Sequence, residues 1–462
     1  MSYKQYRRIR TGPDPKEFTM LLRSLCIICC LFCVDVASVA AAQKLYLRDF
    51  LDLALDKNPQ LEIAVQQYRQ TKGRMTQATA AYLPHLQLGV SLGRNHYDKL
   101  SPVDEDNVAG AGISASQLIY DFGQTTGIIE SSRLTEEAAR SNIEQYLHNV
   151  VLQVKESYYN VLEKRYLIEV AREQKESYEQ HLHRARKFYE AGIRTQIDIT
   201  NAELELANAR LELLRAKADL QSARVELEQV IGTKPNNGQY LVASDQEVDL
   251  NNLSKSAPVL PYSLSQLLAI APDHRPGLRQ IEKLFSAAEA SLKAVRGENW
   301  PLLGATGSYD GYETDLENIP DQWQVTATLT WDIFSGFETE GKIAEARAKM
   351  LELGASRREL ELSIIKDITD HHLRAVENYE SIEIAGLATS LAQRNLELAE
   401  GRYQAGLGDM VEYNDAQLNY TSSRADLISI YFAYLTSIAR LDQAAGIDPG
   451  IPPGTLEILL KK

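Results

Sequence analysis

The chain has 462 residues and a formal net charge of −14 at pH 7, from 49 lysine and arginine residues against 63 aspartate and glutamate residues. An acidic surface repels phosphate backbones, which argues against nucleic acid as a partner. A chain of this length ordinarily predicts two or three domains, but an internal repeat argues for one body made of two similar halves.

Residues 1–42 have the features of a secretory signal peptide. A basic stretch precedes the short apolar run Leu25–Val34, and small residues follow up to Ala42, so we expect cleavage after Ala42. The apolar run is too short to serve as a permanent membrane-spanning helix. Because the basic stretch is long for such a signal, a true start at Met20 remains an alternative.

All cysteines of the chain lie inside this segment. They are Cys26, Cys29, Cys30 and Cys33. The remainder of the chain is therefore predicted to hold neither a disulfide nor a thiolate metal site. Lipid attachment at Cys30 or Cys33 is an open alternative, although neither cysteine follows a Leu-Ala-Gly-like sequence.

The first half, residues 43–232, is predicted to contain helices, a strand hairpin and a long helical hairpin. Amphipathic helical runs lie on either side of Asn58-Pro59. Since proline stops a helix, we expect the first helix to end near this motif and a second to follow it. Apolar residues then alternate with small or polar ones, which predicts strands at about 82–97 and 107–122. The helical hairpin is expected at 124–231, and its first arm would reach roughly 95 Å at 1.5 Å per residue.

The second half repeats this order after a polar connector. The predicted segments are the connector, 233–261; the second repeat, 262–446, with strands at about 299–312 and 321–334 and a helical hairpin at 338–445; and a C-terminal tail, 447–462. We expect the connector and the tail to pack around the outside of the helical body.

The clearest repeat joins Tyr189–Gly232 to Tyr403–Gly446, with a Tyr-x-Ala-Gly turn at the start of each copy. Each copy is helical and carries two apolar stripes in which residues recur every seven positions. In the first copy they are Ile197, Leu204, Leu211, Ala218 and Val225, and Ile199, Leu206, Leu213, Leu220 and Leu227; in the second they are Val411, Leu418, Ala425, Phe432 and Ala439, and Tyr413, Tyr420, Leu427, Tyr434 and Leu441.

A seven-residue repeat indicates supercoiled packing of helices. Stripes two positions apart lie on nearly opposite flanks of a helix, so each of these helices expects a partner on either side. Helices flanked on both sides can close into a ring with a hollow middle. An ordinary helical bundle, whose inner helices also bury two faces, is the alternative.

The predicted strands have one apolar face and one face of glutamine, glycine, serine and threonine, and a soluble sandwich would show the same alternation. Aromatic residues near the strand ends favour a membrane barrel, whose interfaces carry aromatic girdles. The candidates are Tyr82, Tyr97, Trp300, Tyr312, Trp323 and Trp331. Four strands are too few to close a barrel, and open edges in lipid would leave backbone groups unpaired. We therefore expect a homo-oligomer that shares its strands.

The duplicated order of helices, strand hairpin and helical hairpin resembles the TolC-type outer-membrane efflux protein family. The motifs that carry the resemblance are Asn58-Pro59, Tyr120-Asp121-Phe122-Gly123, Trp331-Asp332-Ile333-Phe334-Ser335-Gly336 and the two Tyr-x-Ala-Gly turns. Their order, twice over, is specific, and it covers nearly all of the chain after the signal segment.

The resemblance implies a mainly α protein with membrane β structure, whose homotrimer forms a twelve-stranded β-barrel in the outer membrane. A periplasmic α-helical barrel would continue it as a tunnel. Its partners would be outer-membrane lipid, a periplasmic adaptor protein and, through the adaptor, an inner-membrane pump or ABC transporter. The function implied is a passive exit duct of a tripartite efflux or type I secretion system.

The resemblance also implies a gate at the helical turns. Tyr403 matches the family's latch tyrosine, Asp198 its acidic partner, and Glu412 and Asp415 the two acidic residues at the entrance. Three residues apart on a helix, the two carboxylates share one face, and three copies would favour cations; solvated surface carboxylates are the alternative. The family's latch arginine is absent. Gly408 stands in its place, and Arg194 occupies the corresponding position of the other turn.

The turns at Gly192 and Gly406 are the candidate adaptor-docking sites that follow from the same resemblance. No catalytic residue, cofactor or metal site is predicted. The pairs His181 with His183 and His371 with His372 have spacings that do not place both rings on one helical face, and no metalloprotease, nucleophile-elbow or phosphate-loop motif is present.

Two classes of protein remain, a passive export duct and a structural periplasmic coiled-coil protein without a pore. The four strands favour the duct, since a coiled-coil spacer has no use for them. Drug, metal and polypeptide export are equally compatible with the sequence.

Overall fold

The computed structural model of the chain describes residues 43–96, 105–235, 240–244, 253–313, 322–447 and 450–461. The predicted signal peptide with its cysteines, and Tyr97, lie outside the described residues. The chain divides into two units, one of residues 1–44 and 239–241 and one of residues 45–238 and 242–462. Strands β1 (Gln43–Leu45) and β4 (Tyr240–Val242) form a two-stranded sheet.

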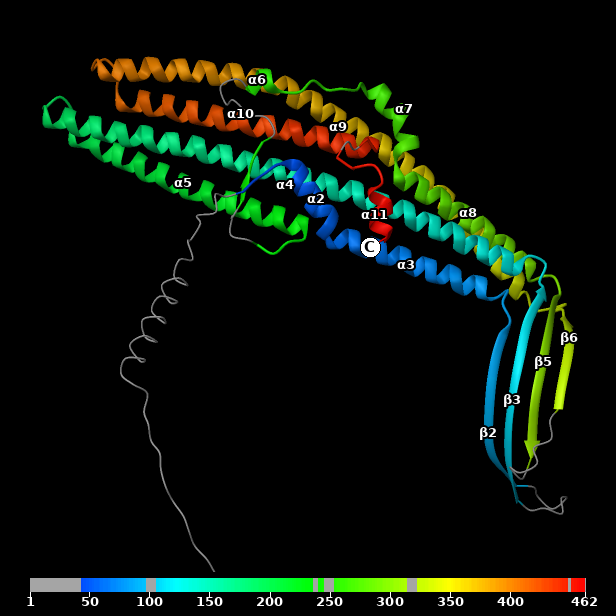
Figure 1. The fold of residues 1–462 in the computed structure, drawn as a ribbon. Coiled ribbons are helices and arrows are strands. Elements are labelled where there is room, and N and C mark those ends of the chain that lie inside the picture. Colours follow the sequence, from blue (N-terminus) through cyan, green and yellow to red (C-terminus); the bar gives the residue numbers. More distant parts are fainter. Residues whose placement is uncertain are drawn as a thin grey trace, which may run out of the picture. The chain divides into compact units, whose positions relative to one another are not determined.

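The larger unit contains one series of elements twice (Figure 1). The first series is α2 (Leu47–Lys57), α3 (Pro59–Ala80), β2 (His85–His96), β3 (Glu105–Tyr120), α4 (Gln124–Glu190) and α5 (Gln196–Ile231); the second is α7 (Leu264–His274), α8 (Pro276–Gly297), β5 (Leu302–Glu313), β6 (Gln322–Thr330), α9 (Glu338–Gln404) and α10 (Met410–Ala445). Both long helices, α4 and α9, have 67 residues, and both returning helices, α5 and α10, have 36. The predicted duplication is confirmed. Short helices α6 (Leu253–Ser256) and α11 (Thr455–Lys461) precede and follow the second series.

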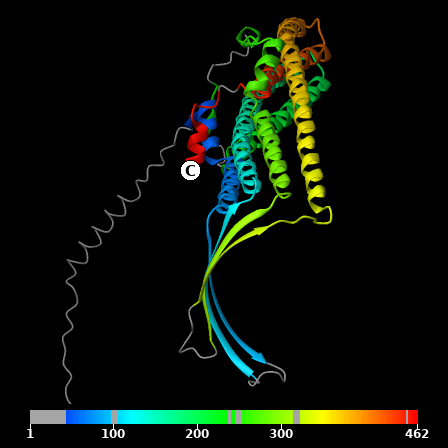
Figure 2. The same cartoon turned by 90° about the vertical axis from the view of Figure 1, so that its right-hand side faces the viewer.

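Four strands form one antiparallel sheet in the order β2-β3-β5-β6, curved as Figure 2 shows. Because β3 pairs with β5, the hairpins of the two halves are joined into a single sheet. β6 ends at Thr330 and not at residue 334 as predicted. Beyond it the chain turns toward α9, and Trp331 Nε1 donates a hydrogen bond to the carbonyl of Asn299 at 3.1 Å.

One face of this sheet consists of large apolar side chains that no described residue covers. They are Leu86, Leu88, Val90 and Leu92 on β2 and Trp323, Val325 and Leu329 on β6, and their exposed fractions run from 65% for Leu329 to 81% for Leu92. Burial of such residues is normally a main source of stability, so an uncovered apolar face of this size indicates that the sheet meets an apolar surface outside the chain.

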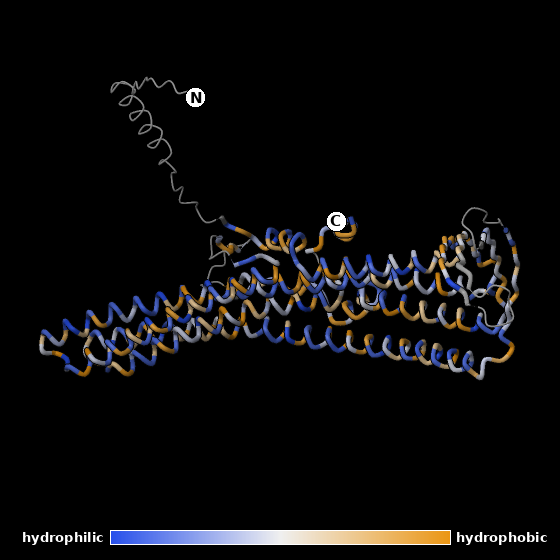
Figure 3. The backbone as a smooth tube through the Cα atoms, turned by 90° about the horizontal axis from the view of Figure 1, so that it is seen from below, coloured by the Kyte–Doolittle hydropathy of each residue, from blue (hydrophilic) through white to orange (hydrophobic). Residues whose placement is uncertain are grey.

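The long helices lie side by side, and α4 is the central one (Figure 1). It contacts α3 and α5 on one flank and α8 and α10 on the other, and α9 packs on α8 and α10. Hydrophobic and hydrophilic stretches alternate along these helices in Figure 3, as supercoiled packing requires. α5 and α9 therefore form the two edges of the row. Among the described residues, no helix is both long enough and apolar enough to cross a bilayer.

The two predicted stripes of α5 differ in burial. The stripe that begins at Ile199 faces α4, and Leu206 and Leu227 in it are 5% and 0% exposed. The stripe that begins at Ile197 is uncovered, and Leu204 in it is 57% exposed. On α10, by contrast, members of both stripes are buried beyond the first turns, for example Phe432 and Tyr434 at 2% and 0%. Thus α10 has a neighbour on both flanks, whereas α5 has one within the chain.

The Asn58-Pro59 motif forms a joint with the end of α5. Gly232, which ends α5 with φ 84°, lies against the backbone carbonyl of Lys57, where a Cβ atom would collide. Asn58 Nδ2 donates to the carbonyl of Val230 at 2.6 Å, and its Oδ1 accepts from the backbone N–H of Gln60 at 2.7 Å, which caps α3.

The second half contains an equivalent joint with different chemistry. Gly446 ends α10 with φ 74°, and a Cβ there would lie 2.8 Å from the carbonyl oxygen of His274. The guanidinium of Arg275 donates to the carbonyl of Gln443 at 2.8 Å. In both halves, the residue before the proline holds the end of the long hairpin against the start of the next helix.

Candidate functional site at the helical turns

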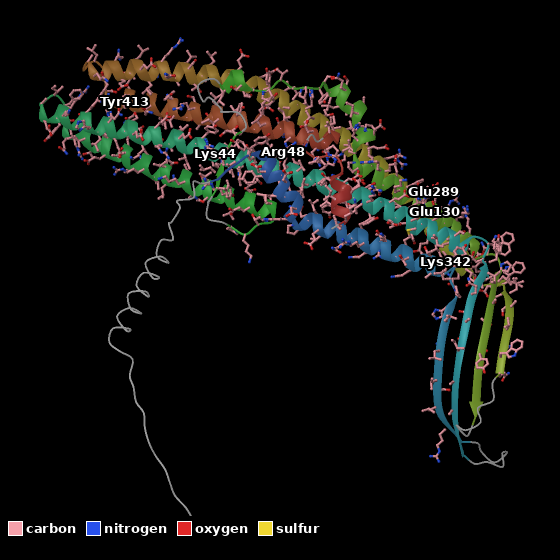
Figure 4. The ribbon with its side chains drawn as sticks, in the orientation of Figure 1. Lys44, Arg48, Glu130, Glu289, Lys342 and Tyr413 are labelled. Atoms are coloured by element: carbon pink, nitrogen blue, oxygen red, sulfur yellow. The ribbon has the colours of Figure 1, made fainter. Side chains whose placement is uncertain are left out.

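The two turns of the long hairpins adopt the same backbone conformation. Gly192 and Gly406 have φ 70° and 75°, a left-handed conformation that glycine adopts without steric cost. The next N–H in each turn reaches back to a helix carbonyl, Ile193 to Phe188 and Leu407 to Arg402, both at 2.9 Å. This is the Schellman pattern that ends helices. Figure 4 shows Tyr413, close to these turns in the sequence, near the end of the helices that lies away from the strands.

Behind the turns, the two hairpins share one buried core. Its members are Tyr178, Leu182 and Ala185 of α4, Ile199, Ala202, Leu206 and Ala209 of α5, Tyr403 of α9 and Met410 of α10. Tyr403 is 1% exposed and Tyr413 is 2% exposed. Because all four helices contribute, the first helical hairpin cannot separate from the second here without exposing aromatic surface to water.

Arg194 connects the first turn to the second. Its guanidinium carbon lies 4.9 Å from the centre of the Tyr403 ring, within the range of a cation–π interaction. Its Nη2 donates a hydrogen bond to the carbonyl of Gly408 at 2.9 Å. Gly408, where the resemblance predicts an arginine, is thus contacted by an arginine from the opposite hairpin.

Gly408 has little room for a side chain. A Cβ atom at this position would lie 3.1 Å from both Arg402 Cβ and Glu412 Oε2. Arg402 Nε and Glu412 Oε1 form an ion pair at 3.0 Å. This pair fills the space beside the turn, so a side chain at 408 would require Arg402 or Glu412 to shift.

The structure does not bring Asp198 into a hydrogen bond with Tyr403. Asp198 Oδ2 accepts from both the backbone N–H and the hydroxyl of Thr195, at 2.9 Å each, and so closes a capping box at the start of α5. The hydroxyl of Tyr403 is buried without a partner among the described residues. Burial is the main cause that raises the pKa of Tyr403 above its ordinary value.

Glu412 and Asp415 are both exposed on α10, but their surroundings differ. Glu412 is ion-paired with Arg402 of its own chain, and Asp409 caps the helix by accepting from the backbone N–H of Glu412 at 2.8 Å. Asp415 is exposed, and no ion pair to it exists within the described part of the chain. Of the two candidate entrance residues, Asp415 is therefore the one whose charge is not already paired within the described part of the chain.

His181 is the residue of this region that the sequence did not single out as part of a gate. It is fully buried, its Nε2 lies 2.7 Å from the sulfur of Met410, and its ring stacks on Tyr413 at 4.5 Å between ring centres with 13° between planes. Burial, reinforced by the charge of Arg184, lowers its pKa to about 4. His183 is exposed. His181 is three residues from Tyr178 and four from Ala185, and this helical spacing was the available signal that His181 faces the core.

Further polar contacts join α4 to the second half behind the turns. Arg184 is ion-paired with Glu400, and Arg424 with Glu173. Ser177 donates to Gln417 Oε1 at 2.9 Å. No group of three or more histidine, cysteine, aspartate or glutamate residues in the described ranges is arranged to hold a metal ion.

Four of the predicted aromatic residues, Tyr82, Trp300, Trp323 and Trp331, are exposed at the ends of the sheet. Tyr82, Trp300 and Trp331 lie where the strands meet the helices, and Trp323 lies toward the other end of β6. Phe122, which the predicted aromatic set did not include, has φ 54° and stacks on Trp300 at 5.5 Å between ring centres. In the second half the order is reversed: Gly336, with φ 66°, corresponds to Phe122, and Phe337, with φ 70°, corresponds to Gly123, which has φ 95°. Two consecutive residues in the left-handed conformation therefore precede the long helix in both halves, and in each half one of the two is a phenylalanine.

The chain matches the family model described as outer membrane efflux protein over residues 50–233 and 267–447. It is 23% identical over 349 residues to the probable efflux pump outer membrane protein TtgC of Pseudomonas putida, covering 73% of this chain and 68% of the relative. It is 24% identical over 425 residues to the alkaline protease secretion protein AprF of Pseudomonas aeruginosa, covering 87% and 84%. Among solved structures, the CmeC outer membrane channel of Campylobacter jejuni has a TM-score of 0.78 at 18% identity, covering 87% of this chain and 85% of that one. The chain therefore belongs to the outer membrane efflux protein family and is a TolC-type outer-membrane channel of efflux or type I secretion that extends into the periplasm.

Proposed function

We propose that three copies of this chain assemble into one passive duct that leads from the periplasm through the outer membrane. The observation that carries the proposal is that both edges of the helical row are apolar and uncovered. On α5 the edge residues are Ile197, Leu204 and Leu211, and on α9 they are Ile384, Leu391 and Leu398, all between 46% and 69% exposed.

These two edges match in the spacing of their apolar residues and in their distance from the turns. In each, apolar residues recur every seven positions, as knobs-into-holes packing requires. Each stripe also lies within the three heptads nearest the turns, because α5 begins there at Gln196 and α9 ends there at Gln404. The α5 edge of one copy can therefore pack on the α9 edge of the next, and repetition closes a ring.

The same closure would complete the sheet in the membrane. The edge strands β2 and β6 have neighbours on one side only within the chain, and an unpaired edge in hydrocarbon is costly for each unsatisfied backbone group. Three four-stranded sheets joined edge to edge make a twelve-stranded barrel. Its apolar face would meet lipid, and Tyr82, Trp300, Trp323 and Trp331 would lie near the two interfaces.

The turns would form the periplasmic end of the duct and its gate. Arg194 would hold the second hairpin of its own chain inward through Tyr403 and Gly408. Glu412 and Asp415, repeated around the axis, would make an acidic entrance that favours cations. The latch in this proposal is an arginine from the first hairpin and not the Tyr403–Asp198 pair.

The partner at this end would be a periplasmic adaptor protein, and through it an inner-membrane pump or ABC transporter. Ile193 and Leu407, at equivalent places in the two turns, are 63% and 75% exposed. Together with Gly192 and Gly406 they offer a small apolar docking surface. The family's members serve both efflux and protein secretion, and the pump would choose the cargo and supply the energy.

The proposal is tested by the mass of the purified protein in detergent and by its conductance in planar bilayers. We expect three chains per particle and stable channels. Leu204→Glu places a charge in the α5 edge and should yield single chains, whereas Lys217→Glu, at an exposed position off the stripe, should leave the trimer intact. Wild-type protein that remains a single chain, or a Leu204→Glu variant that still forms trimers, would contradict the proposed interface.

A further inference from the structure

His181 lies between the two helical hairpins, where a proton has no favourable partner. Its Nε2 faces the thioether of Met410, which is a weak acceptor, and its Nδ1 is buried without a hydrogen bond among the described residues. Tyr413 stacks on one face of the ring and the ring of Tyr403 is centred 5.0 Å away. No water can reach the ring, because its exposed fraction is 0%.

The charged groups around the ring do not compensate for this. On its own helix, Arg184 opposes protonation; on α9, Glu400 favours it but is already ion-paired with Arg184. On α5, Asp198 favours protonation but is held by Thr195. α10 contributes Tyr413 and Met410, neither of which is charged. An imidazolium here would therefore be a buried cation without a counter-ion of its own.

We propose that His181 makes the closed tip acid-labile: protonation of its ring forces Met410 and Tyr413 away from α4 and loosens the second hairpin from the first. The inference rests on the proposed function, in which these turns are the gate. It adds a regulation of the tip by pH, which neither the family membership nor the acidic entrance supplies.

The direction and size follow from proton linkage. Burial lowers the pKa of His181 from 6.5 to about 4 in the closed tip, whereas a ring released to water titrates near its ordinary value. The closed tip is therefore fully favoured above pH 6.5, loses stability as pH falls from 6.5 to about 4, and loses no more below that. This difference in pKa corresponds to about a 300-fold shift per chain in the equilibrium from the closed to the loosened tip. A trimer contains three such sites.

The test compares single-channel conductance of the full-length trimer in planar bilayers at pH 7.5 and pH 4.5. For the wild-type protein we expect open probability to rise at least tenfold at the lower pH. His181→Phe keeps an aromatic ring in the same place but cannot take up a proton, so most of the rise should disappear. His183→Phe, two residues away and exposed, is the matched control and should behave like the wild type. A rise in His181→Phe equal to that of the wild type overturns the proposal.

A second measurement separates the switch from the gate. Hydrogen exchange of residues 403–417 is compared between the wild type and His181→Phe at the same pH, so that intrinsic exchange rates cancel. Faster exchange in the wild type at pH 4.5 and equal exchange at pH 7.5 support the proposal; equal exchange at both overturns it. A third outcome is also possible: exchange depends on His181, but the conductance of the wild type does not change with pH and Arg194→Ala conducts like the wild type. That outcome overturns the proposed function, in which the turns are the gate. If His181→Phe does not assemble, His181→Gln provides the same comparison.

Discussion

Replacing Arg194 with alanine removes both contacts that join the first turn to the second. A cation–π contact contributes about 0.5–2 kcal/mol, and a hydrogen bond from a charged donor about 1.5–3 kcal/mol. Arg194 is half-buried, so the lower ends of these ranges apply, and their sum is about 2 kcal/mol per chain. This corresponds to about a 30-fold shift toward the open tip for each chain.

The assay is single-channel conductance at pH 7.5, where His181 is neutral. We expect Arg194→Ala to open far more often than the wild type, and Arg194→Lys to lie between them, because lysine retains the charge but not the planar group that both covers the Tyr403 ring and donates to Gly408. Tyr403→Phe keeps the ring and should leave the gate closed, since the hydroxyl has no partner in the described structure. An Arg194→Ala channel with wild-type conductance, in a protein that still forms trimers, would refute this account of the latch.

Asp415→Ala should reduce cation preference in planar bilayers more than Glu412→Ala, because Glu412 is already ion-paired within its chain; equal effects would argue against this division of charge, and an unchanged double variant would remove both residues from the entrance. Gly232→Ala should lower the midpoint of thermal unfolding, since it combines a strained positive φ, costing about 1–2 kcal/mol, with a collision against backbone. Gly192→Ala is its control, with the strain but open space around it, and a Gly232→Ala variant no less stable than Gly192→Ala would contradict the model of the joint.

The sequence by itself determined the secondary structure and the duplication, because these depend on local periodicity. A seven-residue spacing of apolar residues without internal proline predicts a long helix whatever surrounds it, and the second hairpin, expected at 338–445, is found as α9, Glu338–Gln404, and α10, Met410–Ala445. Strand ends were less accurate. Apolar and polar residues continue to alternate past Thr330 in the sequence, but β6 ends there. The next residue, Trp331, instead donates a side-chain hydrogen bond to the carbonyl of Asn299.

Only the tertiary structure decided which groups meet at the turns. Arg194 and Gly408 are 214 residues apart in the chain, and His181 and Met410 are 229 apart. Periodicity tells which face of a helix is apolar, but not which helix covers that face, because packing depends on the order of helices in space. It was the structure that left the α5 stripe uncovered at Val225 while burying the equivalent Ala439 of α10. It also placed a histidine, whose spacing argued only against a metal pair, where its charge cannot be solvated.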